Sequence, residues 1–220
     1  MPVIACSFNT GWTCRHLLEE GPAVPVTLPH DAALAEPRTE TAPGGTNTGW
    51  DEGYDYLYEK RFTPDAALQG QTLVLEFEGV YHNAEVWLNG EKLAFNPYGY
   101  TDFKVDLTGK LDFDAENVLQ VIARNADQPN SRWYSGAGIY RDVTLHVLPK
   151  RHIPLDGVYV TTTHELESWA MTIDTELCGV KDNGVLTHVL LDGDVPVCDV
   201  TVEAAGDHAN AVMQVLSPKL

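Results

Sequence analysis

Short runs of alternating apolar and polar residues, separated by turn-forming residues, dominate this chain. In the run 72–78, Leu73, Leu75 and Phe77 fall on one side, and Val74 and the acidic residues fall on the other. This period of two is typical of a half-buried β-strand. Long stretches with the 3.6-residue period of a helix are hard to find, so the pattern predicts an all-β fold.

About eight such runs fill the first 148 residues, which is enough for a jelly-roll sandwich. Asn89-Gly90 separates two of them and predicts a tight hairpin, because both turn positions need a positive φ. The predicted strands of this region are 24–28, 56–62, 72–78, 85–88, 91–95, 103–107, 118–123 and 143–148.

Residues 149–157 hold two prolines, a glycine and a basic cluster, a composition typical of a linker. A second strand series follows, with the spacing of a small immunoglobulin-like β-sandwich. Its predicted strands are 158–163, 169–177, 185–191, 196–203 and 211–216. We therefore expect two domains, a jelly-roll, galactose-binding-like sandwich at 1–148 and an immunoglobulin-like sandwich at 149–220.

Two long segments, 32–55 and 125–141, do not fit strands. Long loops inside a compact domain are usually either functional or disordered. Both segments contain aromatic residues, which argues against disorder. Binding residues are therefore expected in these loops.

The charge balance excludes some partners. Lys and Arg number 14 against 32 Asp and Glu, and the formal net charge is −18. Nucleic acids and anionic membrane surfaces need clustered basic residues, so neither partner is expected. The chain has no apolar run of about 18 residues, and its first residues lack the basic and apolar regions of a secretory signal.

Cysteine usage indicates a reducing compartment. Cys6, Cys14, Cys178 and Cys198 form no CxxC pair, and no Cys/His spacing resembles a zinc site. We interpret them as reduced thiols of a cytoplasmic protein. No metal and no cofactor is expected.

Six short motifs stand out in the first 148 residues. They are Phe8-Asn9 with Gly11-Trp12, VTLPHD ending at Asp31, YLYEKRF at 56–62, FEGVYHNAEVWLNG at 77–90, PYGYTDF at 97–103 and SRWYSGAGIYRDVTL at 131–145. In this order they resemble the amino-terminal region of family 2 glycoside hydrolases, which include β-galactosidases, β-glucuronidases and β-mannosidases. The last motif is the most specific. The second domain resembles the family mainly by position and strand pattern.

The resemblance implies a parent enzyme that hydrolyses a terminal β-glycosidic bond with retention, using two glutamates on a (β/α)8 barrel. Such a barrel needs roughly 250 residues and βα alternation, which this chain lacks, so no catalytic residue is expected in it. The closing SPKL, 217–220, resembles the segment that leads into the barrel. The chain is thus expected to stop at a domain boundary before a missing C-terminal barrel.

The implied role is that of a non-catalytic N-terminal portion of an exo-β-glycosidase, with β-galactosidase favoured by family membership. It would support the barrel and line its pocket for a terminal β-glycoside. A stand-alone carbohydrate-binding module is the alternative. A third interpretation is an architectural role, since the family often assembles as homo-oligomers through these domains.

The best ligand-facing candidates lie together in the second long loop. They are Asn130, Ser131, Arg132, Trp133 and Tyr134. In some β-galactosidases of the family, an acidic residue just before the matching tryptophan reaches the galactose subsite, and an asparagine of the earlier loop does likewise. Here no acid directly precedes Trp133, although Asp127 is close. Asn47 and Asp51 lie where the earlier loop would contribute.

These candidates also have structural interpretations. Arg132 and Trp133 could form a cation–π or packing pair that fixes the loop. The acids near Trp50 could line a sugar pocket or lie on a solvated loop. His30-Asp31 has the composition of a catalytic dyad but no nucleophile beside it, so we expect Asp31 to cap the turn that follows Pro29.

Overall fold

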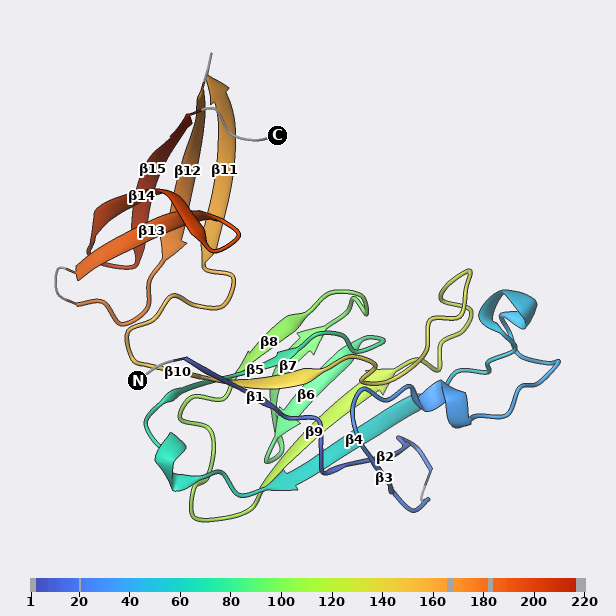
Figure 1. The fold of residues 1–220 in the computed structure, drawn as a ribbon. Helices are drawn as coiled ribbons and strands as arrows, with labels where there is room; N and C mark the ends of the chain where they lie inside the picture. Colours follow the sequence, from blue (N-terminus) through green and yellow to red (C-terminus); the bar gives the residue numbers. More distant parts are fainter. Residues whose placement is uncertain (1–2, 20, 166–167, 182–183, 217–220) are drawn as a thin grey trace. The chain divides into compact units, whose positions relative to one another are not determined.

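The computed structural model describes residues 3–19, 21–165, 168–181 and 184–216. The chain divides into two compact units, Met1–Leu148 and Pro149–Leu220 (Figure 1). The strand pairs within the described residues are all antiparallel, and the helical segments there are short 3-10 turns. The all-β prediction is confirmed.

The first unit is a β-sandwich of two antiparallel sheets. One sheet has the strand order β1-β10-β5-β8 and the other β3-β2-β4-β9-β6-β7. The strands are β1 Ile4–Ser7, β2 Trp12–His16, β3 Val24–Val26, β4 Asp55–Phe62, β5 Thr72–Phe77, β6 Ala84–Leu88, β7 Glu91–Asn96, β8 Phe103–Asp106, β9 Asn117–Arg124 and β10 Val143–Leu148. The 3-10 turns are η1 Ala32–Ala35, η2 Gly45–Thr48 and η3 Ala66–Leu68.

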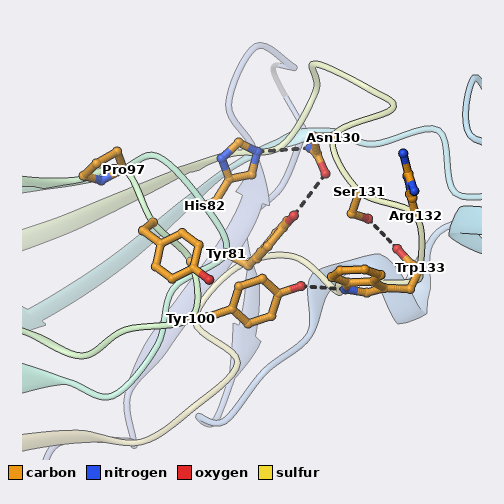
Figure 2. A pocket seen from close by; sticks show the side chains of 10 residues that line it. Tyr81, His82, Pro97, Tyr100, Asn130, Ser131, Arg132 and Trp133 are labelled. Carbon is orange, nitrogen blue, oxygen red and sulfur yellow. Dashed lines mark hydrogen bonds between the residues drawn. The ribbon is translucent and has the colours of Figure 1, made fainter.

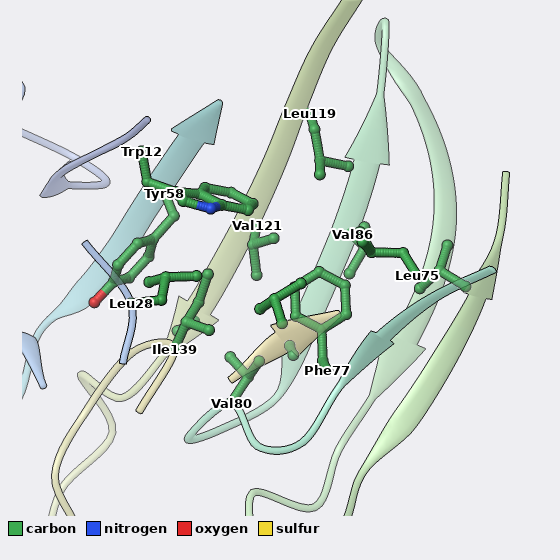
Figure 3. Packing of buried hydrophobic residues seen from close by; sticks show 14 of the residues in the cluster. Trp12, Leu28, Tyr58, Leu75, Phe77, Val80, Val86, Leu119, Val121 and Ile139 are labelled. Carbon is green, nitrogen blue, oxygen red and sulfur yellow. The ribbon is translucent and has the colours of Figure 1, made fainter. Parts of the chain in front are cut away.

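The core of this unit lies between the two sheets. Leu73, Leu75 and Phe77 of β5 are buried, as their alternation predicts, and Val74 faces the other way. Figure 3 shows Phe77 among aliphatic side chains that include Val80 and Val86, while Tyr58 lies in another part of the same cluster, beside Leu28 and Ile139. Each large apolar side chain that is fully buried stabilises the fold by about 1.5–3 kcal/mol.

The hairpin between β6 and β7 has the predicted geometry. Asn89 has a φ of 50° and Gly90 a φ of 84°. The Asn89 side chain also donates to Asn117 Oδ1 at 2.9 Å and accepts from the Val118 amide at 2.8 Å. The turn is therefore tied to the start of β9 as well as to its own strands.

The second unit contains two smaller antiparallel sheets, with the orders β11-β12-β15 and β13-β14. Its strands are β11 Val158–Glu165, β12 Ser168–Glu176, β13 Gly184–Asp192, β14 Val195–Ala204 and β15 His208–Leu216. Ile173, Ala211 and Met213 form the centre of its core. The immunoglobulin-like assignment stays a prediction, and the interpretation of residues 217–220 lies outside the described residues.

The segment 149–157, predicted as a linker, contains no strand in the structure. It is nevertheless attached to the second unit. The amide of His152 donates to the Cys178 carbonyl at 3.2 Å, and the amide of Cys178 donates back to the His152 carbonyl at 2.8 Å. The part of the segment around His152 is therefore held to the connection that follows β12.

Replacing Gly138 with alanine should strongly destabilise the first unit. A Cβ at this position would lie 2.0 Å from the hydroxyl oxygen of Tyr58, which is fully buried, and the φ of Gly138 is +91°. Backbone strain and overpacking together should lower the free energy of unfolding by about 3 kcal/mol or more, measured by urea unfolding.

Gly90→Ala is the matched control, because Gly90 also has a positive φ, +84°, but nothing lies within 4 Å of an added Cβ. It should cost only about 1 kcal/mol. Equal losses in the two variants would refute the steric argument.

Candidate functional site

A pocket of about 600 Å3 opens on the first unit where three connections meet (Figure 2). These connections join β5 to β6, β7 to β8 and β9 to β10. The lining residues are Tyr81, His82, Pro97, Tyr98, Gly99, Tyr100, Asn130, Ser131, Arg132 and Trp133. Three of the sequence motifs thus converge on one place, although they are far apart along the chain.

Asn130 is the most constrained polar side chain of the pocket. Its Oδ1 accepts from the Tyr81 hydroxyl at 3.1 Å, and its Nδ2 donates to Asn125 Oδ1 at 2.8 Å. The same Nδ2 lies 3.0 Å from His82 Nε2 and 3.1 Å from the Asp127 carbonyl. These contacts orient Asn130 and attach its loop to Tyr81 and His82 of the connection between β5 and β6.

Aromatic rings form the exposed part of the lining. Trp133 Nε1 donates to the Tyr100 hydroxyl at 2.9 Å, and the Tyr98 and Tyr100 rings meet edge to face with centroids 5.6 Å apart. Trp133 and Tyr98 are each 58% exposed. Large aromatic surfaces that are both exposed and tethered are suited to cover the apolar face of a ligand.

His82 is half buried in the pocket wall, and its two ring nitrogens contact the side-chain amides of Asn130 and Asn83. Burial lowers the pKa of its imidazole below the ordinary 6.5, although Asp127 and Asp55 act in the opposite direction. Amide nitrogens face both ring nitrogens, Asn130 Nδ2 at 3.0 Å from Nε2 and Asn83 Nδ2 at 2.7 Å from Nδ1, so an imidazolium with two N–H groups fits this arrangement worse than the neutral ring, which has one.

Tyr134, a predicted binding residue, does not line this pocket. Its hydroxyl donates to Asp31 Oδ2 at 2.8 Å, and the Arg38 guanidinium lies over its ring at 5.1 Å. Burial and the neighbouring Asp31 raise the pKa of Tyr134 to about 12, so it stays protonated and keeps donating. It connects the second long loop to the first.

Asp31 has the capping role that the sequence predicted. It is the N-cap of η1, where its Oδ1 accepts from the Ala33 amide at 3.1 Å, and the same oxygen accepts from the Ala137 amide at 2.9 Å. His30 is engaged elsewhere, with its Nδ1 2.8 Å from the Tyr58 hydroxyl. Both His30 and Asp31 therefore have structural roles, in which they position the loops around the pocket.

The two candidates of the first long loop also lie apart from the pocket lining. Asn47 is exposed on η2. Asp51 is only 4% exposed, lies 3.7 Å from Arg38 Nη1, and has a pKa raised by burial. Its neighbour Glu52 accepts from Thr39 and from Tyr54, at 2.7 and 2.9 Å. The carboxylates of Asp51 and Glu52 thus contact residues of their own loop.

Alternation and charge do not point to Tyr81, His82, Tyr98 and Tyr100 as part of the site. They lie inside motifs that carried the family resemblance, but each motif alone has no binding signature. The available signal was the density of tyrosines around Gly99, in a segment too short to bury them all. Cation–π contacts near this site pair Arg38 with Tyr134 and Arg141 with Tyr140, while the Trp133 indole bonds to Tyr100.

No metal centre emerges from the described part of the chain. Within it, no group of three or more His, Cys, Asp and Glu side chains gathers closely enough to hold an ion. The same residues include no helix with the length and apolarity needed to cross a membrane.

The fold and the pocket define a class of protein, an antiparallel β-sandwich whose loops form an aromatic-lined pocket, and comparison with known proteins identifies the family. The profile described as "Glycosyl hydrolase 2 galactose-binding domain-like" matches residues 25–145. The β-galactosidase BoGH2A of Bacteroides ovatus is 41% identical over 180 residues, 81% of this chain. The chain belongs to glycoside hydrolase family 2, which confirms the resemblance read from its motifs.

Other relatives agree with this assignment. A β-glucuronidase of Formosa agariphila is 32% identical over 141 residues, covering 54% of this chain and 14% of that protein. The crystal structure of a β-glycosidase from Bacteroides vulgatus matches 99% of this chain with a TM-score of 0.84 at 25% identity. The chain spans 20% of the length of BoGH2A and 30% of the Bacteroides vulgatus chain.

Acid should loosen the loop that carries Asn130. Because the folded-state pKa of His82 lies below its ordinary value of 6.5, the stabilisation by the neutral ring is complete above about pH 6.5. It is lost as the pH falls below that value. An NMR titration should give a His82 midpoint below 6.5, with the amide shifts of residues 127–133 following the same curve.

His82→Gln should abolish this titration, because glutamine keeps a hydrogen-bonding group that carries no charge in the same range. A midpoint at or above 6.5, or loop shifts that persist in the variant, would contradict the assignment.

Proposed function

We propose that this chain is the non-catalytic N-terminal portion of a family 2 exo-β-glycosidase that acts on β-galactosides in carbohydrate metabolism. In this role it supports a C-terminal catalytic barrel and contributes the pocket around Trp133 to sugar binding. The observation that carries the proposal is one pocket that combines exposed aromatic rings with fixed polar groups. Tyr98 and Trp133 supply the rings, and Asn130 and Arg132 supply hydrogen-bonding groups.

The chemistry of these groups suits a pyranose. Aromatic faces cover the C–H surface of a sugar, and amide, guanidinium and hydroxyl groups bond to its hydroxyls. Asn130 is already oriented by its own contacts, which lowers the entropy lost when a ligand is bound.

Bond cleavage is assigned to another part of the parent protein. Retaining hydrolysis needs two carboxyl groups about 5–5.5 Å apart. The lining of the pocket, taken over the described residues, includes neither Asp nor Glu. The role of this chain is therefore to hold and shape the sugar site, and the purified chain is expected to leave aryl-β-glycosides intact.

The choice of a galactoside rests on the relatives. BoGH2A is named a β-galactosidase, and the Formosa agariphila relative is named a β-glucuronidase. Arg132 is the feature of the pocket that would favour an acidic sugar, because a guanidinium pairs well with a carboxylate. The two sugars must therefore be compared directly.

A cytoplasmic location is part of the proposal. It is supported by Cys6, Cys14, Cys178 and Cys198, which are all free thiols, as expected in a reducing compartment.

The pocket can be tested inside an active enzyme. This chain would replace the matching segment of BoGH2A, and kcat/KM would be measured on aryl β-galactoside and β-glucuronide substrates. Tyr98→Ala and Trp133→Ala should each lower kcat/KM for the galactoside about tenfold, which corresponds to the loss of roughly 1.4 kcal/mol. Unchanged kinetics in both variants would remove the pocket from the proposal.

Phe95→Ala is the matched control. Phe95 is 56% exposed, close to the exposure of Tyr98, and lies outside the pocket lining. It should leave the kinetics unaltered. A higher kcat/KM for the β-glucuronide than for the β-galactoside would move the substrate assignment to acidic sugars, provided that Arg132→Gln removes the difference.

Calorimetric titration of the isolated chain separates the accessory role from a stand-alone binding module. Galactose, glucuronate and mannose should give no binding tighter than about 1 mM if the chain is an accessory part. Tighter binding that is lost in Trp133→Ala would favour the module. Hydrolysis by the purified chain, abolished by a point substitution in it, would overturn the non-catalytic role.

A further inference from the structure

His16, the last residue of β2, lies between two acidic side chains that come from different segments. Its Nε2 is 2.7 Å from Glu36 Oε1, and its Nδ1 is 3.1 Å from Glu19 Oε2. The second contact is an ion pair that lacks the alignment of a hydrogen bond. Because a neutral imidazole carries one N–H and an imidazolium carries two, this arrangement favours the charged ring.

The two carboxylates differ in strength as partners. The Glu36 side chain is 14% exposed, whereas the Glu19 side chain is 67% exposed. Water screens an exposed ion pair, so the partly buried contact with Glu36 is the stronger one. The Tyr56 hydroxyl also donates to Glu36 Oε1, at 3.3 Å, and holds this carboxylate beside the ring.

His16 contacts both ends of the first long loop. Glu36 is the C-cap of η1, near the start of the loop, and Tyr54 directly precedes β4, where the loop ends. The Tyr54 ring is stacked on the imidazole, with centroids 4.5 Å apart and planes 14° apart. An aromatic face attracts a cation, so this contact also favours the protonated ring.

Between its ends the loop is closed by its own contacts. The Thr39 amide donates to the Trp50 carbonyl at 3.2 Å, and the Thr39 hydroxyl donates to Glu52 at 2.7 Å. Glu52 also accepts from the Tyr54 hydroxyl at 2.9 Å. Tyr54 thus connects the closed middle of the loop to His16 on the sandwich.

We infer that the contacts of His16 with Glu36 and Tyr54, here called the His16 clasp, close the first long loop only while the imidazole is protonated. A neutral ring keeps an N–H for at most one of its two carboxylates and loses the charge attraction to both. The ends of the loop then separate more often, and the loop opens. The inference concerns the chain itself and does not depend on the proposed function.

The surroundings of His16 make it the histidine that responds above pH 6.5. Burial alone lowers the pKa of His16, but the hydrogen bond to Glu36 and the contact with Glu19 outweigh it, so the pKa lies above the ordinary 6.5. The clasp is therefore complete below about pH 6.5 and is lost as the pH rises through the raised pKa.

Other titratable and charged groups lie around the ring, beside a cavity of about 320 Å3. They are Cys14, Arg15, Glu19, His30, Glu36 and Tyr56. Burial raises the pKa of the Cys14 thiol to about 11 and raises that of Tyr56, while burial lowers the pKa of His30. A hydrogen bond to Glu52 raises the pKa of Tyr54. These four groups are therefore neutral just above pH 6.5, and the Arg15 guanidinium stays charged.

The His16 clasp has the opposite pH dependence to His82. The pKa of His82 is lowered, so the loop that carries Asn130 loosens in acid, whereas the first long loop loosens in alkali. The two loops touch where the Arg38 guanidinium lies over the Tyr134 ring at 5.1 Å. Both are held fully only in a window around pH 6.5.

Trypsin can report on the clasp in the intact chain. Arg38 is the one Lys or Arg in the segment 32–55, and its side chain is 36% exposed. Cleavage after Arg38 would be followed by mass spectrometry in the unmodified chain and in His16→Gln, at about pH 6.5 and about pH 9. At the lower pH the variant should be cleaved about tenfold faster, because its loop opens more often.

At the higher pH the two cleavage rates should approach one another, because the unmodified ring has lost its proton. Taking the ratio at each pH removes the pH dependence of trypsin itself. A merely structural role of His16 would give the same ratio at both pH values, and that result would overturn the inference.

His146→Gln is the matched control. His146 Nε2 also contacts a carboxylate, Glu76 Oε2 at 2.8 Å, but the pair lies on β10 and β5 of the other sheet. Cleavage after Arg38 should be unaltered in this variant at both pH values. Faster cleavage in it would show that loss of any histidine–carboxylate pair opens the loop, against the inference.

An NMR titration of the unmodified chain gives a reading that does not depend on how well a variant folds. The His16 ring should titrate with a midpoint above 6.5, and the amide shifts of Thr39 and Trp50 should follow the same curve. A midpoint at or below 6.5, or loop amides that do not follow His16, would refute the clasp.

Discussion

The carboxylate of Asp31 joins the two long loops on which the site depends. It accepts hydrogen bonds from the backbone amides of Ala33 and Ala137 and from the hydroxyl of Tyr134. Hydrogen bonds to a charged group each contribute about 1.5–3 kcal/mol, and removing the acceptor would leave part-buried donors unpaired. The segment that carries Trp133 therefore depends on an acid that lies 103 residues before Tyr134 in the chain.

The sandwich beneath these loops determines where they lie. Tyr58 spans the core, with its hydroxyl close to His30 on one side and to the backbone of Gly138 on the other. Gly138 in turn pairs with Tyr81 through two backbone hydrogen bonds of 2.9 Å each. Tyr81 then donates to Asn130 in the pocket. A chain of contacts thus runs from the core to the side chains that line the pocket.

Alternation predicted the strands of both units because burial of one face leaves a direct mark on sequence, as in β5. It missed β1 and β2. In the case of β1, Ile4–Ser7 is an exposed edge strand that gains order mainly from pairing with β10. The pocket was predicted only along its Asn130–Trp133 wall. Tyr81, His82, Tyr98 and Tyr100 join that wall through tertiary packing, which no local pattern records. Conversely, Asp51 has a carboxylate that could bond to sugar hydroxyls, but it is buried beside Arg38 and does not line the pocket.

The two units differ in how completely their inward side chains are buried. In the first, inward residues such as Leu75, Val86 and Val121 are fully buried, so the scaffold of the pocket is complete within residues 1–148. In the second, the inward Val158 and Val160 remain half exposed. Apolar burial is the main favourable term in folding, so a unit that lacks it gains stability from whatever covers its face. The first unit therefore holds the pocket on a fully packed core, while the inward face of the second unit is only partly covered by the described residues.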